Sequence, residues 1–276
     1  MSKKNLLLKP VLKWVGGKRQ LLDAIVPLIP ECSTYVEPFV GGGAVLLDLQ
    51  PSKAVINDYN EELINVYLCV RDHTDELIAL LKEHARLNSS DYFYSVRAYD
   101  REHNYAERSD VERAARILYL NKTCYNGLYR VNSAGQFNSP YGRYKNPAIV
   151  NEPAIRALAT YLQGNVTIMC GDYTQALKGL RKGSFVYFDP PYMPISSSSS
   201  FTGYTEVGFG FEEQSRLKKE CDKLASRGIH FLQSNSDCPE IRSLYADYEI
   251  LTVKAKRSIN SMANRRGEVN EVLIRG

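Results

Sequence analysis

The sequence predicts an α/β protein with a mostly parallel sheet, and three observations support this. Short apolar runs of strand length alternate with segments of helical periodicity in both the early and the late parts of the chain. Between about 61 and 149 the pattern is helical and then polar, so this region interrupts the alternation. The 276 residues are 44% hydrophobic and 24% charged, which is typical of one large globular domain with an insertion.

Each expected element rests on a local signal. A strand at 35–36 leads into a glycine turn, after which 43–49 begins a helix, and a second strand is expected at 54–57. Later strands are expected at 166–169, 185–188, 229–232, 248–253 and 271–274, with helices at 212–226 and 240–245. In the middle region, helices are expected at 76–87 and 111–120. The chain is therefore divided into a discontinuous α/β domain, 1–60 and 150–276, and an inserted region, 61–149.

The basic residues are unevenly distributed. Residues 1–22, 113–151 and 250–267 contain no Asp or Glu, yet they hold 17 of the 35 basic residues, although the net charge is only +4. Such a field suits a polyanion, and chance clustering on solvated faces is the alternative. No apolar run approaches the roughly 18 residues of a membrane helix, and the apolar run near the N-terminus is too short for a signal peptide. We expect a cytoplasmic protein with no membrane partner.

The cysteines show no metal-binding spacing. All six lie 17 to 55 residues apart, without a C-x-x-C pair, and the chain has only four histidines. We expect reduced thiols and no metal.

Two turns carry ligand-binding signals. Glu37 and the glycines at 41–43 lie between a strand and a helix, where a ligand can approach the backbone closely. The spacing departs from the dinucleotide fingerprint G-x-G-x-x-G, so a pyrophosphate site is disfavoured, and a purely structural turn remains an alternative. Asp58 follows the second strand, where an acid can bind a ribose or cap a helix.

The sequence Asp189-Pro190-Pro191-Tyr192 follows a very apolar strand, at the end where open α/β sheets bind ligands. The prolines stiffen the turn and remove two N–H donors, so carbonyl acceptors remain beside the Asp189 carboxylate and the Tyr192 ring. This combination suits a planar base with an exocyclic NH₂, and a structural strand terminator is the alternative.

In this order, the motifs resemble those of the DNA adenine methyltransferase (Dam) family, and most closely its DpnM-like members in restriction-modification systems. The resemblance rests on Lys13 to Lys18, Glu37 to Gly43, Asn57-Asp58, Gly171 to Tyr173 and Asp189 to Tyr192. It implies transfer of methyl from S-adenosylmethionine (SAM) to adenine N6 in double-stranded GATC by a monomeric enzyme. It also implies a Rossmann-like SAM-dependent methyltransferase sheet in the discontinuous domain. The region 61–149 would be a mainly helical DNA target-recognition domain carrying a β-hairpin.

The resemblance assigns roles to individual residues. The methionine and sulfonium end of SAM would be bordered by Trp14, Lys18, Glu37, Phe39, Gly41 and Gly43. Asp58 would hold the ribose, and Asp172 and Tyr173 would contact the cofactor adenine. The catalytic turn would comprise Asp189, Pro190, Pro191 and Tyr192, with Asp189 and the Pro190 carbonyl accepting from the target NH₂ and Tyr192 stacking on the flipped base.

The segment 121–145 resembles the recognition hairpin of the family. Arg130 would read one guanine, and Lys13 the other. Leu128 and Pro140 would touch a thymine methyl, and Tyr125 and Asn126 would wedge into the base stack. The remaining expected DNA-binding residues are Asn132, Arg143 and Tyr144.

Two other functions remain open at this stage. One is a SAM-dependent N-methyltransferase acting on RNA or on a protein glutamine, against which the hairpin and the opening Asp189 argue. The other is a catalytically silent DNA-binding protein, against which the complete set of acceptors argues.

Overall fold

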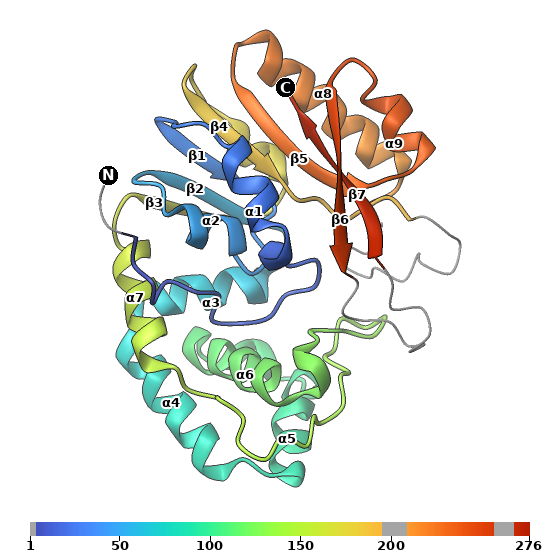
Figure 1. The fold of residues 1–276 in the computed structure, drawn as a ribbon. Coiled ribbons are helices and arrows are strands. Elements are labelled where there is room, and N and C mark those ends of the chain that lie inside the picture. The colour runs from blue at the N-terminus through green and yellow to red at the C-terminus, as the bar shows by residue number, and fades with distance from the viewer. Residues whose placement is uncertain (1–3, 195–208, 257–267) are drawn as a thin grey trace.

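The computed structural model describes residues 4–194, 209–256 and 268–276. A seven-stranded sheet has the order β3-β2-β1-β4-β5-β7-β6, and the first five strands in this order are parallel. β7 pairs antiparallel with both β5 and β6. The strands are β1 Thr34–Glu37, β2 Ala54–Asp58, β3 Val166–Cys170, β4 Ser184–Phe188, β5 His230–Ser236, β6 Glu249–Lys256 and β7 Glu268–Arg275. The expected α/β class with a mostly parallel, Rossmann-like sheet is confirmed (Figure 1).

Helices cover both faces of the sheet. They are α1 Leu22–Ile25, α2 Ala44–Leu49, α3 Glu61–Asp72, α4 Thr74–Leu87, α5 Ser90–Ala98, α6 Asp110–Thr123, α7 Glu152–Leu162, α8 Phe211–Ser226 and α9 Pro239–Leu244. Side chains alternate along each strand, so Tyr35 and Tyr187 join one core with α1 to α7. Val36 and Phe188 join a second core with α8, α9 and the 3-10 helix η6, Tyr173–Leu177.

β5 is longer than the sequence pattern predicts. The expected strand covered 229–232, whereas β5 continues to Ser236 with its polar end fully inside the protein. Hydrogen bonds make this burial tolerable, because Ser234 bonds Tyr187 Oη at 2.7 Å and Asn235 donates to Gln214 at 3.0 Å. A strand whose second half is polar lacks the apolar run by which buried strands are recognised.

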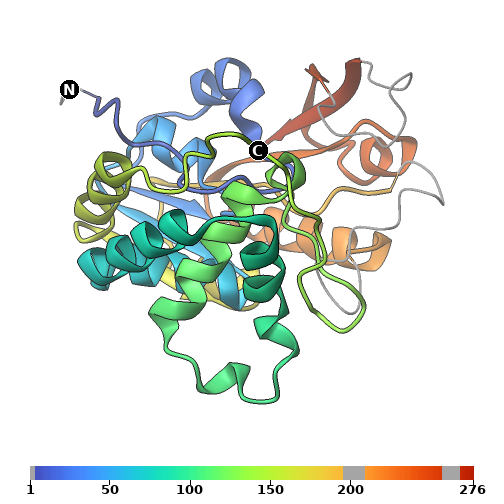
Figure 2. The ribbon, with the colours of Figure 1, turned by 90° about the horizontal axis from the view of Figure 1, so that it is seen from below.

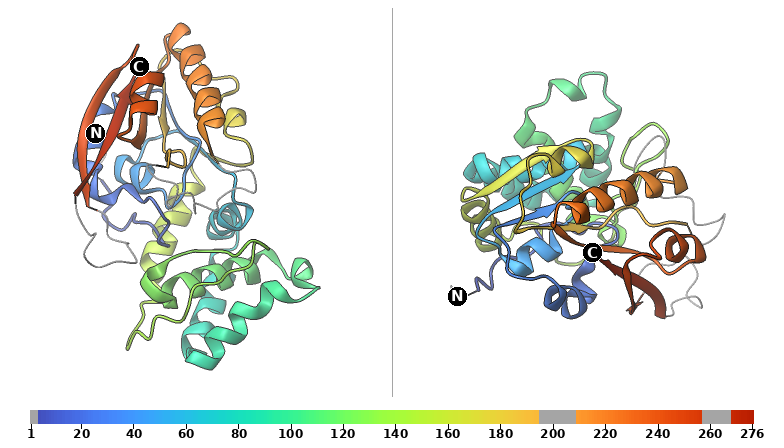
Figure 3. Two further views of the ribbon diagram at one scale, coloured as in Figure 1. Left: turned by 90° about the vertical axis from the view of Figure 1, so that its right-hand side faces the viewer. Right: turned by 90° about the horizontal axis from the view of Figure 1, so that it is seen from above.

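Helices α3 to α6 lie in the middle region, 61–149. α4, α5 and α6 lie together below the sheet in Figure 1. Figure 3 (left) shows the same arrangement from the side. α6 begins with a capping box, in which Ser109 and Glu112 satisfy each other's backbone N–H groups. α3 contacts α6 and α7 as well as β2 and β3, so the two regions share one hydrophobic core. The boundary at residue 60 stays a prediction.

The segment after α6 follows a hairpin path but forms no strand. It has two isolated antiparallel bridges, Cys124 with Tyr141 and Val131 with Phe137. Its tip turns at Asn132, whose Oδ1 accepts from Ala134 N at 3.1 Å and Gln136 N at 2.9 Å. Figure 2 shows it as a long yellow-green loop beside the helices. We call residues 121–145, which begin in the last turn of α6, the recognition hairpin. It has no continuous backbone ladder. Instead, the side chains of Arg97, Arg101 and Asp100 form hydrogen bonds with its backbone and hold it against the helical region.

Candidate active site

The loops with the predicted site residues meet at the carboxyl ends of the parallel strands. β1 and β4 are neighbours at the centre of the sheet, where the strand order reverses direction. Ligands of open α/β sheets bind outside the carboxyl ends of the strands at such a switch point. The loops after β1, β3 and β4 carry the glycine turn, Asp172 and Asp189 respectively, and Asp58 is the last residue of β2.

The glycine turn is held from three sides. Gly41 and Gly43 have φ values of +49° and +68°, which favour glycine. A Cβ on Gly43 would lie 2.8 Å from Tyr67 Oη, and one on Gly41 would lie 3.0 Å from the Trp14 ring. Gly41 also donates to Asp58 Oδ2 at 3.0 Å and accepts from Tyr67 Oη at 2.9 Å. Residues larger than glycine would therefore strain the turn and displace its neighbours.

Asp58 and its neighbour Asn57 connect three of the loops. Asp58 Oδ1 accepts from Asn60 N, so both of its oxygens already bind backbone N–H groups. Burial raises the pKa of this carboxyl, although these hydrogen bonds oppose the shift. Asn57 Nδ2 donates to the carbonyls of Pro38 at 3.0 Å and Gly171 at 2.9 Å, while its buried Oδ1 has no partner among the described residues.

Two aromatic rings and an acid lie at the end of β3. The rings of Phe39 and Tyr173 are 5.1 Å apart, and the buried Tyr173 hydroxyl has no partner among the residues described. Asp172 receives two hydrogen bonds from Arg216 of α8, at 2.9 and 3.0 Å, and a short one from Thr174 Oγ1. These contacts lower the pKa of Asp172 against the effect of its desolvation. No local sequence signal marks Arg216, because its contact with Asp172 spans 44 residues.

Asp189 forms an ion pair with Lys18. Their Nζ–Oδ1 distance is 2.7 Å, and Lys18 also donates to the Gly16 carbonyl at 2.6 Å. The Lys18 ammonium lies 4.8 Å from the centre of the Tyr192 ring, within cation–π range. Burial raises the pKa of Asp189 to about 6, Lys18 acts against this shift, and Glu271 adds to it. The Tyr192 hydroxyl donates to Glu271 Oε2 of β7 at 2.7 Å.

Buried amides support the turn from below. Gln214 Nε2 donates to the Pro191 carbonyl at 3.0 Å, and Gln214 in turn accepts from Asn235 Nδ2. Asn235 Oδ1 accepts from Met193 N at 3.2 Å. No described residue donates to the Pro190 carbonyl. Of the two proline carbonyls, that of Pro191 is thus the one that a buried amide binds.

Glu37 is buried under the glycine turn. Its Oε2 accepts from Tyr35 Oη at 2.9 Å and from Leu46 N in the first turn of α2 at 3.1 Å. Burial raises the pKa of Glu37 to about 8, and the charge of Asp189 adds to the shift. Its predicted place beside the cofactor stays a prediction.

The residues expected to bind DNA gather on the recognition hairpin and the segment before η1, Lys18–Gln20. Trp14 stacks on Tyr129 with ring centroids 4.6 Å apart, so the N-terminal segment lies against the hairpin. Asn121 exchanges two 2.8 Å hydrogen bonds with the Lys13 backbone. The exposed Lys13 side chain passes Gly127, where a Cβ would lie 2.6 Å from Lys13 Cδ.

Alternation along the hairpin separates an inner from an outer face. Tyr129, Phe137 and Ser139 are buried. The outer face carries Leu128, Arg130, Asn132, Asn138 and Pro140, which are exposed or partly exposed. Tyr125, Asn126 and Tyr144 form a second group, in which Asn126 N donates to Tyr144 Oη at 2.9 Å. Arg143 is exposed and has a positive φ of 53°. The predicted DNA-binding residues are therefore presented together, and their individual base contacts stay predictions.

Neither a metal cluster nor a membrane helix is found in the described ranges. Residues 4–194, 209–256 and 268–276 hold no group of three or more His, Cys, Asp or Glu side chains suited to a metal ion. No helix within those ranges is long and apolar enough to span a bilayer. All six cysteines are free thiols. The serine run 196–200 lies outside the described residues.

Comparison with known proteins identifies close relatives over the full chain. Residues 14–259 match the family described as D12 class N6 adenine-specific DNA methyltransferase. The chain is 46% identical to Type II methyltransferase M1.LlaDCHI of Lactococcus lactis subsp. cremoris, covering 99% of this chain and 97% of that protein. It is 37% identical to the DNA adenine methylase of Escherichia coli K12, covering 98% and 95%. Among solved structures, a precorrin 8w decarboxylase of Methanobacterium thermoautotrophicum aligns over 97% and 94% of the two chains with a TM-score of 0.38 at 11% identity, too weak a likeness to interpret.

Proposed function

The chain belongs to the D12 class of N6 adenine-specific DNA methyltransferases, and on this premise we propose that it methylates adenine in double-stranded GATC with SAM as donor. The family resemblance expected from the motifs is thereby confirmed. Membership of an adenine-specific DNA methyltransferase family favours DNA as the substrate over RNA or a protein glutamine. It also favours an active enzyme over a catalytically silent DNA-binding protein.

The residues at the carboxyl end of the sheet fit SAM. The rings of Phe39 and Tyr173 offer an apolar surface for an adenine, and the Tyr173 hydroxyl, which has no hydrogen-bond partner among the described residues, lies in the same region. Carboxylate oxygens of Asp58 and Asp172 are acceptors for ribose hydroxyls and for the adenine amine. Gly41 and Gly43, with their left-handed backbone, let a ligand approach the backbone closely. SAM has no phosphate, so it needs no phosphate-binding loop. When bound, SAM supplies a methyl group made electrophilic by its sulfonium.

The Asp189 turn would activate the target base. Adenine N6 is a weak nucleophile because its lone pair is delocalised into the ring. Hydrogen bonds from its two N–H groups to Asp189 and to the Pro190 carbonyl draw N6 toward a tetrahedral geometry and localise that pair. Pro190 and Pro191 keep the turn stiff. The Pro191 carbonyl already accepts a hydrogen bond from Gln214, so the Pro190 carbonyl is the one proposed to accept from the base. Tyr192 offers its ring to the unstacked base and offsets part of the cost of flipping it.

The recognition hairpin supports a sequence-specific target. Arg130 on its outer face has the donors for a guanine edge, and Leu128 and Pro140 offer apolar contact for a thymine methyl. The neighbouring Trp14 and Tyr129 connect this hairpin to the glycine turn. The relatives include a Type II methyltransferase and a DNA adenine methylase, and we propose restriction-modification or Dam-like DNA marking as the role of the transfer.

The observation that carries the proposal is that the Asp189 turn and the glycine turn follow β4 and β1, two neighbouring parallel strands at the switch point of the sheet. Asp189→Ala is expected to abolish tritium transfer from labelled SAM to GATC duplexes while changing the SAM dissociation constant only a few-fold, because the carboxylate binds the target amine. Asp247→Ala, at an exposed acid, is the control and should retain full transfer. Turnover of Asp189→Ala above a tenth of wild type would remove Asp189 from this role. Long-read methylome sequencing of expressing cells identifies the target sequence.

A further inference from the structure

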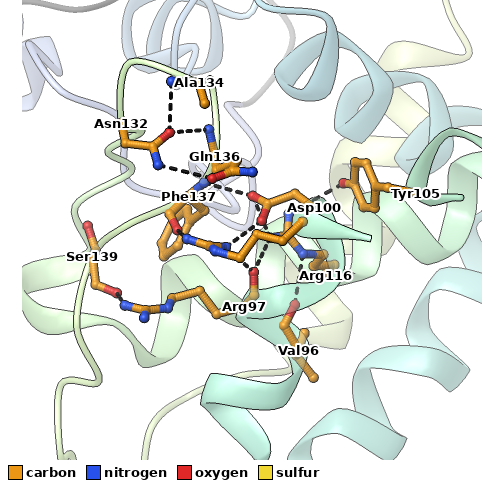
Figure 4. Close-up of polar contacts among 11 residues, drawn as sticks. Val96, Arg97, Asp100, Tyr105, Arg116, Asn132, Ala134, Gln136, Phe137 and Ser139 are labelled. Carbon is orange, nitrogen blue, oxygen red and sulfur yellow. Dashed lines mark hydrogen bonds and ion pairs between the residues drawn. The ribbon is translucent and has the colours of Figure 1, made fainter. Parts of the chain in front are cut away.

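A partly buried carboxylate outside the active site holds the returning arm of the recognition hairpin. Asp100, in the 3-10 helix η3 (Tyr99–Arg101), accepts from Phe137 N at 2.7 Å through Oδ2. The same oxygen lies 2.8 Å from Arg116, and Oδ1 lies 2.5 Å from Arg101. Figure 4 shows Asp100 of η3 lying between Arg116 of α6 and Phe137 of the hairpin. The acid thus joins the helical region to the hairpin at one residue, Phe137.

The support beneath Asp100 is rigid. Arg116 of α6 is 2% exposed, and it donates to the carbonyls of Val96 at 2.9 Å and Arg97 at 2.8 Å. Both carbonyls belong to the last turn of α5, so Arg116 caps that helix while it pairs with Asp100. Because the guanidinium has several fixed partners, the acid that it faces has little freedom to move.

Arg101 completes the hold on Phe137. Its Nη2 donates to the Phe137 carbonyl at 2.8 Å, so both polar groups of this residue are bound by η3. The Phe137 ring is buried and packs edge-on against Tyr129. The residue that follows, Asn138, therefore starts from a fixed backbone position and points to the opposite, outer face.

Asn138 binds one edge of the Arg130 guanidinium. Arg130 Nε donates to Asn138 Oδ1 at 2.6 Å, and Arg130 Nη2 donates to the Asn138 carbonyl at 3.3 Å. Asn138 N also donates to the Arg130 carbonyl at 2.9 Å. A guanidinium has five N–H donors in one plane, and these two bonds take the pair on its Nε side. The pair at its far end, one N–H from each terminal nitrogen, is not used by Asn138.

We propose that Asn138, seated by Asp100 and Arg101, is a positioning residue for base recognition, which holds Arg130 so that its end-on donor pair faces a guanine edge. The inference rests on the proposed function, because it assumes that Arg130 reads a base. A free arginine side chain populates many rotamers, and ordering it on DNA costs conformational entropy at each encounter. A guanidinium that Asn138 already holds in one orientation avoids much of this entropy cost. The benefit applies only to a base that offers two acceptors in the plane of the guanidinium. Asn138 therefore raises discrimination between bases more than affinity for DNA.

The test compares Asn138→Ala with Asn138→Asp, which keeps the acceptor, and with Ser133→Ala, a matched change at the exposed tip. For each variant, kcat/KM is measured on a duplex with the sequence that the wild type methylates and on duplexes altered at one guanine of it. The ratio of the first value to the second measures discrimination between bases. Asn138→Ala should lower the ratio about tenfold, within the range that a bidentate contact supplies. Asn138→Asp should keep the ratio within about twofold, while its added negative charge weakens binding to unrelated DNA at low salt. Ser133→Ala should match wild type.

A double-mutant cycle with Arg130→Ala separates positioning from general structural loss. In that background, Asn138→Ala should leave the ratio unchanged, because no guanidinium remains to be held. Asn138→Ala that slows both duplexes equally, or that still lowers the ratio without Arg130, would overturn the inference. In both cases the wild type would still methylate its target, so the proposed function would stand. A wild type that methylates no adenine, or shows no preferred sequence, would instead refute the proposed function.

Discussion

Lys18→Gln should shift the acidic limb of the pH–rate profile to higher pH. Asp189 accepts most strongly when it is ionised, and its pKa is about 6, so kcat/KM on DNA should rise through about pH 6 and then level off. The Lys18 ammonium at 2.7 Å favours the ionised carboxylate. Removing this charge raises the folded-state pKa of Asp189, which keeps the acid protonated to a higher pH.

The size of the shift follows from the contact. An opposite charge within hydrogen-bond distance lowers a carboxyl pKa by roughly 1 to 3 units, so the variant should have an Asp189 pKa of about 7 to 9. For a value of about 8, roughly 3% of the variant is ionised at about pH 6.5, against about three-quarters of wild type. The variant should therefore lose about 25-fold in kcat/KM at that pH and much less near pH 9.

The assay is tritium transfer from labelled SAM at subsaturating DNA, with ionic strength held constant across the pH range. Glu271→Gln is the matched control with the opposite sign, because the Glu271 charge raises the Asp189 pKa and its removal should move the limb to lower pH. Gln at 271 still accepts from Tyr192. Glu37→Gln tests whether the buried Glu37, whose pKa is about 8, contributes a limb of its own. A Lys18→Gln profile with its limb unmoved and a loss equal at every pH would refute the reasoning and make Lys18 a ligand contact.

Three further predictions concern other parts of the molecule. Asp58→Ala should weaken SAM binding by calorimetry with less effect on turnover at saturation, and an unchanged dissociation constant would count against the ribose assignment. Arg130→Ala should lower kcat/KM for GATC by one to two powers of ten, from the ~1 to 3 kcal/mol of a bidentate guanine contact. If it loses equally on a site altered at that guanine and its salt slope falls by about one unit, Arg130 is a phosphate anchor. Asp100→Ala should destabilise the fold by about 3 to 5 kcal/mol, because it leaves the buried Arg116 without its carboxylate. A melting temperature within a few degrees of wild type, compared with Asp247→Ala, would contradict that value.

The turns that carry the chemistry could be read from the sequence, because their signals are local. Gly41 and Gly43 adopt the left-handed backbone that a glycine-rich strand-to-helix turn predicts. Asp189 to Tyr192 follow an apolar strand, and β4 ends directly before them. Alternating apolar runs likewise predicted the α/β class and the parallel strands. In each case the physical cause lies within a few residues of the observed structure.

Only the tertiary structure showed what holds those turns in place. Gln214 reaches the Pro191 carbonyl from α8, and Glu271 reaches the Tyr192 hydroxyl across 79 residues of sequence. Asp100 seats the recognition hairpin across 37 residues, where a backbone ladder had been expected. A polar side chain gives the same local signal whether it is solvated or buried against a partner. Its role is decided by which distant carbonyl or hydroxyl the packed elements bring within about 3 Å, because a buried polar group must find a partner and the fold alone supplies it.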